Sequence, residues 1–260
     1  MRYAQRLKER LETTGSALCV GLDPRPDLTE GGIDGVPEFL RRVVGETSEY
    51  AAAFKPNMAY FEAMGLRGIE ILEELLGMMP KEVPVILDAK RSDIGETQKY
   101  YAQSYFENWQ VDAVTLNPFL GYDTLEPFLD WEGKGVYLLA VTSNPGSVDF
   151  QRRDCEGRAV FERVGDLCER ALSEGRSTTA GLVVGLTNAD GEVLANLPDV
   201  PLLIPGLGAQ GGSLDALRGS GREAASVVNV SRGITYAGEN RDYAGLARHW
   251  AGEISRSLCE

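Results

Sequence analysis

Four charged side chains lie at the ends of apolar segments, and their types and spacing suit chemistry. In 83-VPVILDAKRSDIGET-97 an apolar run ends in Asp88, which is followed by Lys90 and Asp93, while Lys55 ends an earlier apolar run. Residues i and i+2 of a strand point the same way, so Asp88 and Lys90 are expected to lie together. An array that alternates Lys and Asp keeps all four groups ionised, because each charge favours the opposite charge beside it.

A network of ion pairs that joins strand ends is a plainer interpretation of the same four residues. A buried ion pair often fails to repay the cost of removing its charges from water. Stability is therefore a weak reason for a chain to keep such a cluster. The pattern favours an active site, and the purely structural alternative stays open.

Two glycine-rich segments late in the chain form a second candidate site. They are 205-PGLGAQGGS-213 and 229-NVSRGITYAG-238. Glycine lets the backbone approach a ligand closely and present free N–H groups, which suit a phosphate. Arg232 adds a fixed positive charge with a fork of donors, and Gln210 adds a side-chain amide. One such segment fits a plain turn, but two of them with an arginine favour phosphate binding.

Three other groups are weaker candidates. Ser143, in 142-TSNPGS-147, could hydrogen-bond an amide or a carboxylate, although the same letters fit a Pro-Gly turn. His249 is the sole histidine; it fits an ordinary helix face and is a poor base for a serine nucleophile. Arg152 and Arg153 fit a mobile lid or, more simply, a solvated loop. The 4 cysteines form no Cys-x-x-Cys pair, so no metal site is predicted.

Eight short apolar segments recur along the chain and must position these residues. Each has the length and composition of a strand. They are 17-ALCVGLD-23, 51-AAAFKPN-57, 83-VPVILDAK-90, 112-DAVTLNP-118, 135-GVYLLAVTS-143, 180-AGLVVGLT-187, 200-VPLLIPGLG-208 and 226-SVVNVSRG-233. Between and after them lie segments of helical period, such as 58–76, 158–175 and 242–258.

This alternation predicts a (β/α)8 TIM barrel, in which helices cover strands that are apolar on both faces. An open doubly wound sheet is the alternative, but eight units in 260 residues favour closure. No linker or low-complexity segment divides the chain, so residues 1–260 are predicted to form a single domain, with an N-terminal helix over 1–15. In such barrels chemistry occurs at the carboxyl ends of the strands, where the candidate residues fall.

The composition argues against several classes of protein. The formal net charge is −13, whereas general nucleic-acid binding needs a basic surface. That charge also repels an anionic substrate, so a phosphate requires positive charge concentrated locally. No apolar run approaches the ~18 residues of a transmembrane helix, and residues 1–15 lack the apolar stretch of a signal peptide. We expect a cytoplasmic protein that binds neither nucleic acid nor membranes, which fits unpaired cysteines.

Seven segments resemble orotidine 5′-phosphate decarboxylases. In chain order they are GLDPRPD, FKPNMAYFE, DAKRSDIGET, TLNPFLG, TSNPGS, PGLGAQGG and NVSRGI, and DAKRSDIGET resembles the Asp-x-Lys-x-x-Asp signature of that family. The central signature alone is moderately specific, but all seven together span nearly the whole chain and are highly specific. FKPN and SNPGS look like the longer-chain bacterial and archaeal branch of the family.

The resemblance implies cofactor-free loss of CO₂ from orotidine 5′-phosphate, which gives UMP in the last step of pyrimidine synthesis. It implies a homodimer with shared active sites and a catalytic tetrad of Lys55, Asp88, Lys90 and Asp93, in which Asp93 reaches the site of the other subunit. Lys90 is then the natural cation to stabilise the C6 anion and protonate it. Asp88 would lie against the departing carboxylate, either destabilising it or positioning Lys90.

The resemblance also implies the contacts to the rest of the substrate. Asp23 and Thr97 match ribose contacts, Ser143 matches the serine that meets the pyrimidine, and Gln210 and Arg232 match phosphate contacts. Ser231 departs from the pattern, since many members have glycine before the arginine. A backbone N–H survives that change, so Ser231 remains a candidate phosphate contact whose fine geometry differs.

Two other functions compete with this one. A sugar-phosphate decarboxylase or isomerase of the same barrel group would hold a metal at the mouth, but its site needs a carboxylate near the second strand, where this chain has Lys55. An inactive nucleotide-binding barrel could act as a regulator, and the intact tetrad argues against it.

Overall fold

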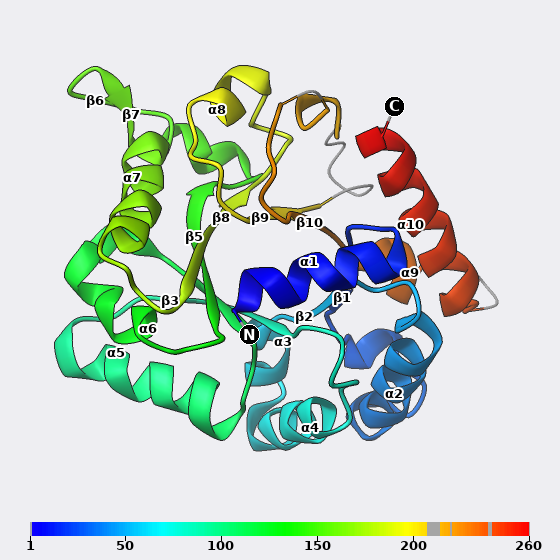
Figure 1. Ribbon diagram of the computed structural model, residues 1–260. Helices are drawn as coiled ribbons and strands as arrows, with labels where there is room; N and C mark the ends of the chain where they lie inside the picture. The colour runs from blue at the N-terminus through cyan, green and yellow to red at the C-terminus, as the bar shows by residue number, and fades with distance from the viewer. Residues whose placement is uncertain (1, 207–213, 219, 239–240, 260) are drawn as a thin grey trace.

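Eight parallel strands form the centre of the computed structural model, which describes residues 2–206, 214–218, 220–238 and 241–259. They are β1 (Leu18–Leu22), β2 (Ala53–Pro56), β3 (Ile86–Arg91), β4 (Ala113–Leu116), β5 (Gly135–Val141), β8 (Thr179–Val184), β9 (Leu202–Pro205) and β10 (Val227–Val230). Neighbours follow the order β2-β1-β10-β9-β8-β5-β4-β3. Two parallel bridges, Phe54 with Val85 and Asn57 with Asp88, join β2 to β3 and complete the ring (Figure 1). The predicted TIM barrel is confirmed, and the open-sheet alternative is wrong.

The strands are mostly apolar because both of their faces are covered. Every residue of β1, β2, β4 and β10 is buried. Alternate side chains point into the barrel or outwards to the helices, as strand geometry requires. Each of the eight predicted segments overlaps one of these strands, and β3 and β8 each extend one residue beyond the predicted bounds.

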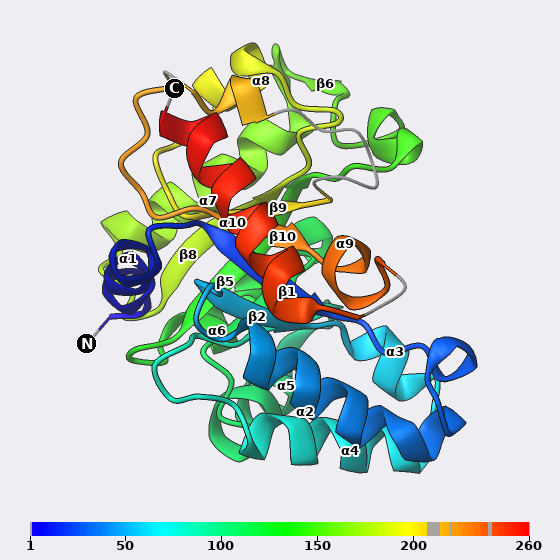
Figure 2. The same ribbon diagram turned by 90° about the vertical axis from the view of Figure 1, so that its right-hand side faces the viewer.

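Helices alternate with the strands and surround the barrel (Figures 1 and 2). They are α1 (Tyr3–Thr14), α2 (Val36–Thr47), α3 (Met58–Glu62), α4 (Gly65–Gly77), α5 (Gly95–Ala102), α6 (Glu126–Leu129), α7 (Val160–Ser173), α8 (Gly191–Ala195), α9 (Arg232–Thr235) and α10 (Tyr243–Cys259). The helices predicted over 1–15, 158–175 and 242–258 correspond to α1, α7 and α10. In the described ranges, no helix is long and apolar enough to cross a membrane.

The helix predicted over 58–76 is two helices, α3 and α4. Gly65 has a φ of 65°, in the left-handed region that favours glycine, and α4 starts there in a new direction. Gly68 then lets the two helices touch, since a Cβ at this position would lie 1.9 Å from the carbonyl oxygen of Phe61. The apolar spacing continues through the break, which is why periodicity alone did not reveal it.

Helix α1 closes the amino-terminal end of the barrel, at the left of Figure 2. Its buried residues Tyr3 and Leu7 pack in one cluster with side chains from the strands, including Cys19 and Val227. The hydroxyl oxygen of Tyr3 lies 3.1 Å from that of Tyr137 on β5. One end of the barrel is thus filled by packing, and the carboxyl end carries the polar residues.

The connections contain structure that the sequence did not predict. Strands β6 (Asp154–Cys155) and β7 (Arg158–Ala159) form a short antiparallel hairpin before α7. Arg152 and Arg153 lie exposed just ahead of it, as a solvated loop would place them. The π-helix η3 (Gln103–Asn108) continues α5, and short 3₁₀ helices are η1 (Pro26–Leu28), η2 (Gly32–Gly35), η4 (Pro118–Leu120), η5 (Tyr122–Thr124), η6 (Pro145–Val148) and η7 (Leu214–Ala216).

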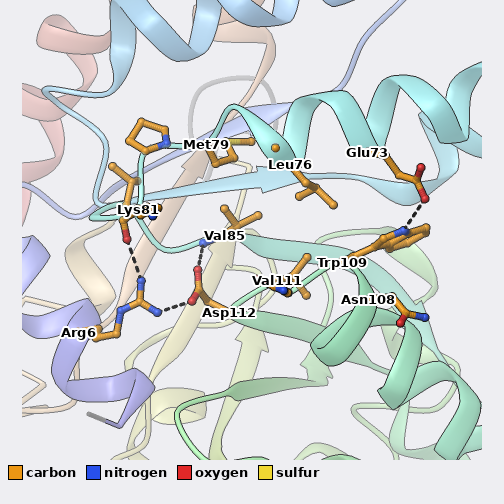
Figure 3. Close-up of a pocket in the computed structure, with 14 residues that line it drawn as sticks. Arg6, Glu73, Leu76, Met79, Lys81, Val85, Asn108, Trp109, Val111 and Asp112 are labelled. Carbon is orange, nitrogen blue, oxygen red and sulfur yellow. Dashed lines mark hydrogen bonds and ion pairs between the residues drawn. The ribbon is translucent and has the colours of Figure 1, made fainter.

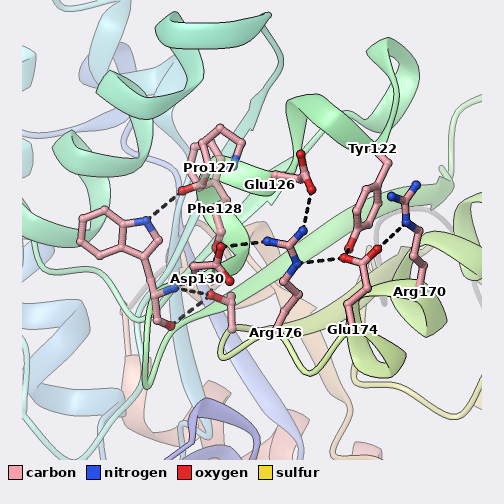
Figure 4. Close-up of polar contacts among 10 residues, drawn as sticks. Tyr122, Glu126, Pro127, Phe128, Asp130, Arg170, Glu174 and Arg176 are labelled. Carbon is pink, nitrogen blue, oxygen red and sulfur yellow. Dashed lines mark hydrogen bonds and ion pairs between the residues drawn. The ribbon is translucent and has the colours of Figure 1, made fainter.

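A cluster of charged side chains joins α6 to the end of α7 (Figure 4). Arg176 donates hydrogen bonds to Glu126 at 2.5 Å, to Asp130 at 2.9 Å and to Glu174 at 2.9 Å. Glu174 also accepts one from Arg170, at 2.7 Å. Because the first two carboxylates belong to α6 and the segment after it, Arg176 connects two neighbouring units of the barrel.

Candidate functional site

Lys55, Asp88 and Lys90 meet at the carboxyl end of the barrel. Lys55 lies on β2, and the other two lie on the neighbouring strand β3. The Nζ atom of Lys55 lies 2.7 Å from Oδ2 of Asp88, and the Nζ atom of Lys90 lies 2.5 Å from Oδ1. Two ammonium groups therefore bind the two oxygens of one carboxylate, which is the Lys–Asp–Lys part of the predicted array.

Lys55 and Asp88 stay charged although their side chains are almost fully buried. The side chains of Lys55 and Asp88 are 5% and 10% exposed. Burial alone would lower the pKa of Lys55, but the charges of Asp88 and Asp23 and the hydrogen bond to Asp88 raise it well above its ordinary value. Burial would raise the pKa of Asp88, yet Lys55 and Lys90 hold that pKa far below its ordinary value. Lys55 and Asp88 thus form a fixed pair of opposite charges near neutral pH.

Lys90 reaches Asp88 through an irregular stretch of β3. The two side chains do lie together, but not through the regular strand geometry that the sequence analysis assumed for residues i and i+2. The φ of Lys90 is 47°, in the left-handed region that residues other than glycine seldom adopt. The pairing of β3 with β4 shifts register between Leu87 and Arg91. Bulges of this kind re-aim a side chain and are common beside active sites. Here the ammonium group meets Asp88 while 48% of the Lys90 side chain remains exposed.

A buried threonine of the next strand belongs to this cluster, and sequence analysis missed it. Thr115 lies on β4, where its Oγ1 is 3.0 Å from Oδ1 of Asp88 and 2.8 Å from the backbone nitrogen of Lys90. A signal was present in the sequence. Thr115 is the polar residue inside the apolar run of β4, two positions after Ala113, which faces the barrel interior.

Asp93 and Thr97 follow β3 but do not join the cluster of their own chain. Asp93 is half-buried, and its Oδ1 accepts a hydrogen bond of 2.8 Å from the backbone N–H of Ile94. Thr97 is exposed on α5. Within the described part of the chain, no ion pair links Asp93 to Lys55 or Lys90. The fourth member of the predicted array is therefore separate from the other three in one chain.

The neighbouring strands β1 and β10 bring Asp23 and Ser231 together. The Ser231 hydroxyl donates to Oδ2 of Asp23 at 2.6 Å. The other oxygen, Oδ1, is buried and has no partner among the described residues, so it can accept a hydrogen bond from a ligand hydroxyl. Arg232 is the first residue of α9 and is exposed. Gln210 lies outside the described residues.

Of the weaker candidates, Ser143 lies at the end of a barrel strand, whereas His249 lies on an outer helix. Ser143 is half-buried at the end of β5, close enough to β8 that a Cβ on Gly185 would lie 2.7 Å from its nitrogen. The Pro-Gly turn also exists, as the 3₁₀ helix η6 that starts at Pro145. His249 is exposed on α10, with its ring 5.6 Å from that of Trp250, as an ordinary helix-face residue would be. Across the described ranges, no three His, Cys, Asp or Glu side chains are grouped to hold a metal.

A cavity of about 720 Å³ lies at the opposite end of the barrel, between α1, the end of α4 and the start of β4 (Figure 3). Its polar groups already bind one another. Arg6 pairs with Asp112 and donates to the carbonyl of Lys81 at 3.2 Å, and the Trp109 indole donates to Glu73 at 3.2 Å. Because catalytic groups of TIM barrels lie at the carboxyl ends of strands, this cavity is a seam between elements and not the reaction site.

Comparisons with known proteins identify the family of this chain. Residues 16–245 match the model of the family described as Orotidine 5′-phosphate decarboxylase / HUMPS family. The orotidine 5′-phosphate decarboxylase of Dehalococcoides mccartyi is 40% identical over 267 aligned residues, which cover 99% of this chain and 97% of that protein. The enzyme of the same name from Azoarcus sp. is 42% identical over 95% of each chain. The solved structure of Leishmania donovani OMP decarboxylase is 36% identical, covers 98% of each chain and gives a TM-score of 0.85.

Proposed function

This chain belongs to the orotidine 5′-phosphate decarboxylase / HUMPS family, and from that premise we propose how its residues act. It is an orotidine 5′-phosphate decarboxylase, an enzyme of pyrimidine biosynthesis that converts its substrate into UMP and CO₂. Lys55, Asp88 and Lys90 carry the reaction. The observation that supports this assignment is the pair of ammonium groups 2.7 and 2.5 Å from the two oxygens of Asp88, at the mouth of the barrel.

The proposed chemistry breaks the bond between C6 of the pyrimidine and its carboxylate. CO₂ leaves, and the electron pair of that bond stays on C6, where no adjacent group delocalises it. The Lys90 ammonium stabilises this charge and then gives one proton to C6, which leaves a neutral amine on Lys90. Asp88 remains ionised against the substrate carboxylate because Lys55 binds its other oxygen. Lys90 thus supplies both the positive charge and the proton, and the mechanism includes neither a cofactor nor a metal ion.

The rest of the substrate is proposed to lie across the barrel mouth. Ser143 contacts the pyrimidine, and Asp23 accepts from a ribose hydroxyl through its buried free oxygen, Oδ1. Arg232, with Ser231 and Gln210, binds the phosphate. The phosphate is remote from C6 and does not react. The free energy of binding it can therefore drive closure of the site and lower the barrier to decarboxylation.

The proposed enzyme is a homodimer in which Asp93 and Thr97 serve the active site of the partner subunit. Asp93 has no ion pair to the lysines of its own described chain, and apolar side chains that follow it in the sequence are exposed. Ile94 is 64% exposed, and Tyr100 on α5 is 65% exposed. A partner that covers these side chains would remove apolar surface from water and bring its carboxylate to Lys90.

A spectrophotometric assay with orotidine 5′-phosphate tests the proposed function. We expect turnover to UMP that survives exhaustive treatment with a metal chelator, since protein side chains supply the charge and the proton. Loss of activity that returns with added metal would instead support the metal-dependent sugar-phosphate class. The proposal also places the enzyme in the cytoplasm, supported by the free thiols of Cys19, Cys155 and Cys168, and cell fractionation tests that placement.

A further inference from the structure

The pairing between β3 and β4 contains a gap that a side chain fills. The ladder is regular up to Leu87 and resumes at Arg91. Between these points, residues 88–90 of β3 lie opposite Thr115 alone on β4. The backbone N–H of Lys90, which a regular ladder would direct to a main-chain carbonyl, donates instead to Oγ1 of Thr115 at 2.8 Å.

The Thr115 hydroxyl bonds to both halves of the Asp88–Lys90 pair. It accepts from the Lys90 backbone and donates to Oδ1 of Asp88 at 3.0 Å. A hydroxyl has one donor and two lone pairs, so both bonds form at the same time. Thr115 is 1% exposed, which means that solvent is not in place to substitute for either bond.

Both bonds act on groups that need support. The left-handed backbone of Lys90, with a φ of 47°, is a strained conformation that persists only where its surroundings hold it. The same Asp88 oxygen that accepts the hydrogen bond from the Thr115 hydroxyl also binds the Lys90 ammonium at 2.5 Å. The hydroxyl therefore fixes the strand on which the ammonium is carried and the carboxylate to which the ammonium is bound.

We propose that Thr115 is a positioning residue for decarboxylation, whose hydroxyl holds Lys90 and Asp88 in the arrangement that the reaction requires. It acts through those two residues and does not itself touch the substrate. The inference rests on the catalytic roles proposed above for Lys90 and Asp88. Because it concerns the geometry of the reacting groups and not affinity for the phosphate or ribose, loss of the hydroxyl lowers kcat more than it raises KM.

The test compares Thr115→Val, which keeps the shape and removes both bonds, with Thr115→Ser, which keeps the hydroxyl. We expect Thr115→Val to lower kcat by about tenfold to a hundredfold, the range in which a small misplacement acts, while KM changes by less than about threefold. Thr115→Ser should keep kcat within about threefold of wild type. Should Thr115→Val not fold, Thr115→Ala against Thr115→Ser makes the same comparison.

Thr47→Val is the matched control, since Thr47 is also fully buried and its hydroxyl donates to the carbonyl of Val43 within α2 at 2.7 Å. It should leave kcat unchanged. Unchanged kcat in Thr115→Val, or an equal loss in Thr115→Ser, overturns the inference. Lys90→Ala, assayed in parallel, distinguishes a failure of the role inferred for Thr115 from a failure of the role proposed for Lys90. If Lys90→Ala is inactive and Thr115→Val is normal, only the role of Thr115 fails, whereas an active Lys90→Ala removes the premise as well.

Discussion

Asp88 is the residue around which the candidate site is organised. Its carboxylate accepts hydrogen bonds from side chains on three adjacent strands, Lys55 on β2, Lys90 on β3 and Thr115 on β4. The two lysines hold its pKa far below the ordinary value, against the opposite effect of burial. A substrate carboxylate beside it, as proposed, would therefore meet a negative charge. The same bonds also orient Lys90, so this geometry is compatible with either proposed role of Asp88, destabilising the substrate carboxylate or positioning Lys90.

Lys90→Ala should abolish decarboxylation and leave a folded barrel that still binds UMP. The physical reason is that the variant loses the cation and the proton donor at C6 but keeps the phosphate and ribose contacts. Lys81→Ala is a suitable control, because Lys81 is an exposed lysine at the opposite end of the barrel. Turnover, UMP affinity and thermal unfolding are measured for each protein. Near-normal turnover by Lys90→Ala contradicts the assigned role.

Arg232→Ala should weaken the use of orotidine 5′-phosphate and leave the unphosphorylated nucleoside almost unaffected. A hydrogen bond to a charged group contributes about 1.5–3 kcal/mol, so kcat/KM for the phosphorylated substrate should fall by roughly tenfold to a hundredfold. Arg67→Ala, which removes an arginine paired with Glu70 and Glu74 on the outer helix α4, should change neither substrate. Equal losses for both substrates would count against a phosphate contact.

At the scale of elements, buried strands were predictable and departures from regular geometry were not. A strand covered on both faces is mostly apolar, so each run of that kind located a strand. The break at Gly65 was hidden, because the apolar spacing passes through it unchanged. The left-handed backbone of Lys90 was hidden for a similar reason, since it depends on a hydroxyl from β4 that is distant in sequence.

In the candidate site, too, some features were predictable from the sequence and others were not. The position of Lys55, Asp88 and Lys90 at strand ends predicted that they lie together, because the carboxyl ends of barrel strands converge at one mouth. Thr115 was missed because it sits inside a run that was interpreted only as core. The roles of these residues remain predictions, as do those of Asp23, Ser143 and Arg232 towards the substrate.

The charged cluster between α6 and α7 should make stability depend on acid pH. Hydrogen bonds from Arg170, and then from Tyr122 and Arg176, lower the pKa of Glu174 from 4.5 to about 2. A carboxyl group whose pKa is lower in the folded state stabilises that state above its unfolded pKa, and the effect is lost as the pH falls through the folded pKa. Wild type should therefore exceed Glu174→Gln in thermal midpoint by a constant amount above about pH 5, and the gap should close towards pH 2.

The control is Glu169→Gln, since Glu169 is an exposed residue of α7, the helix that ends just before Glu174, and takes no part in the bonds of Figure 4. It should not change the midpoint. Glu174 is itself accessible to solvent, so added salt should narrow the gap between wild type and Glu174→Gln at neutral pH. A gap that persists unchanged from pH 7 to pH 3 would show that the ion pairs are not its cause.

At the scale of the whole molecule, we propose that the 260 residues form a single domain that pairs with a second copy. Strands from both ends of the chain meet in one sheet, since Leu18 of β1 pairs with Val228 of β10. The dimer matters for chemistry because Asp93 is proposed to act in the partner's site. The net charge of −13 repels an anionic substrate, so local cations such as Lys90 and Arg232 must capture it.

Mixing two inactive homodimers, Lys90→Ala and Asp93→Ala, should restore activity if active sites are shared. A mixed dimer then contains one site with both changes and one site with neither. Random exchange makes about half of the dimers mixed, so about a quarter of all sites become wild type. Activity is measured before and after mixing, with subunit exchange followed independently. Complete exchange without recovered activity contradicts the shared site, provided that each parent is inactive alone.

The closure of the barrel also bears on how the protein is made. Helix α1 and β1 leave the ribosome early, yet Tyr3 packs on Tyr137, and Leu18 pairs with Val228. At about 5–20 residues per second, β1 waits roughly 10–40 seconds for that last neighbour. During this time the nascent chain carries an unpaired strand edge and an uncovered apolar helix stripe. Lys8 and Glu12 are exposed charged residues on α1, of the kind that opposes aggregation of uncovered apolar surface.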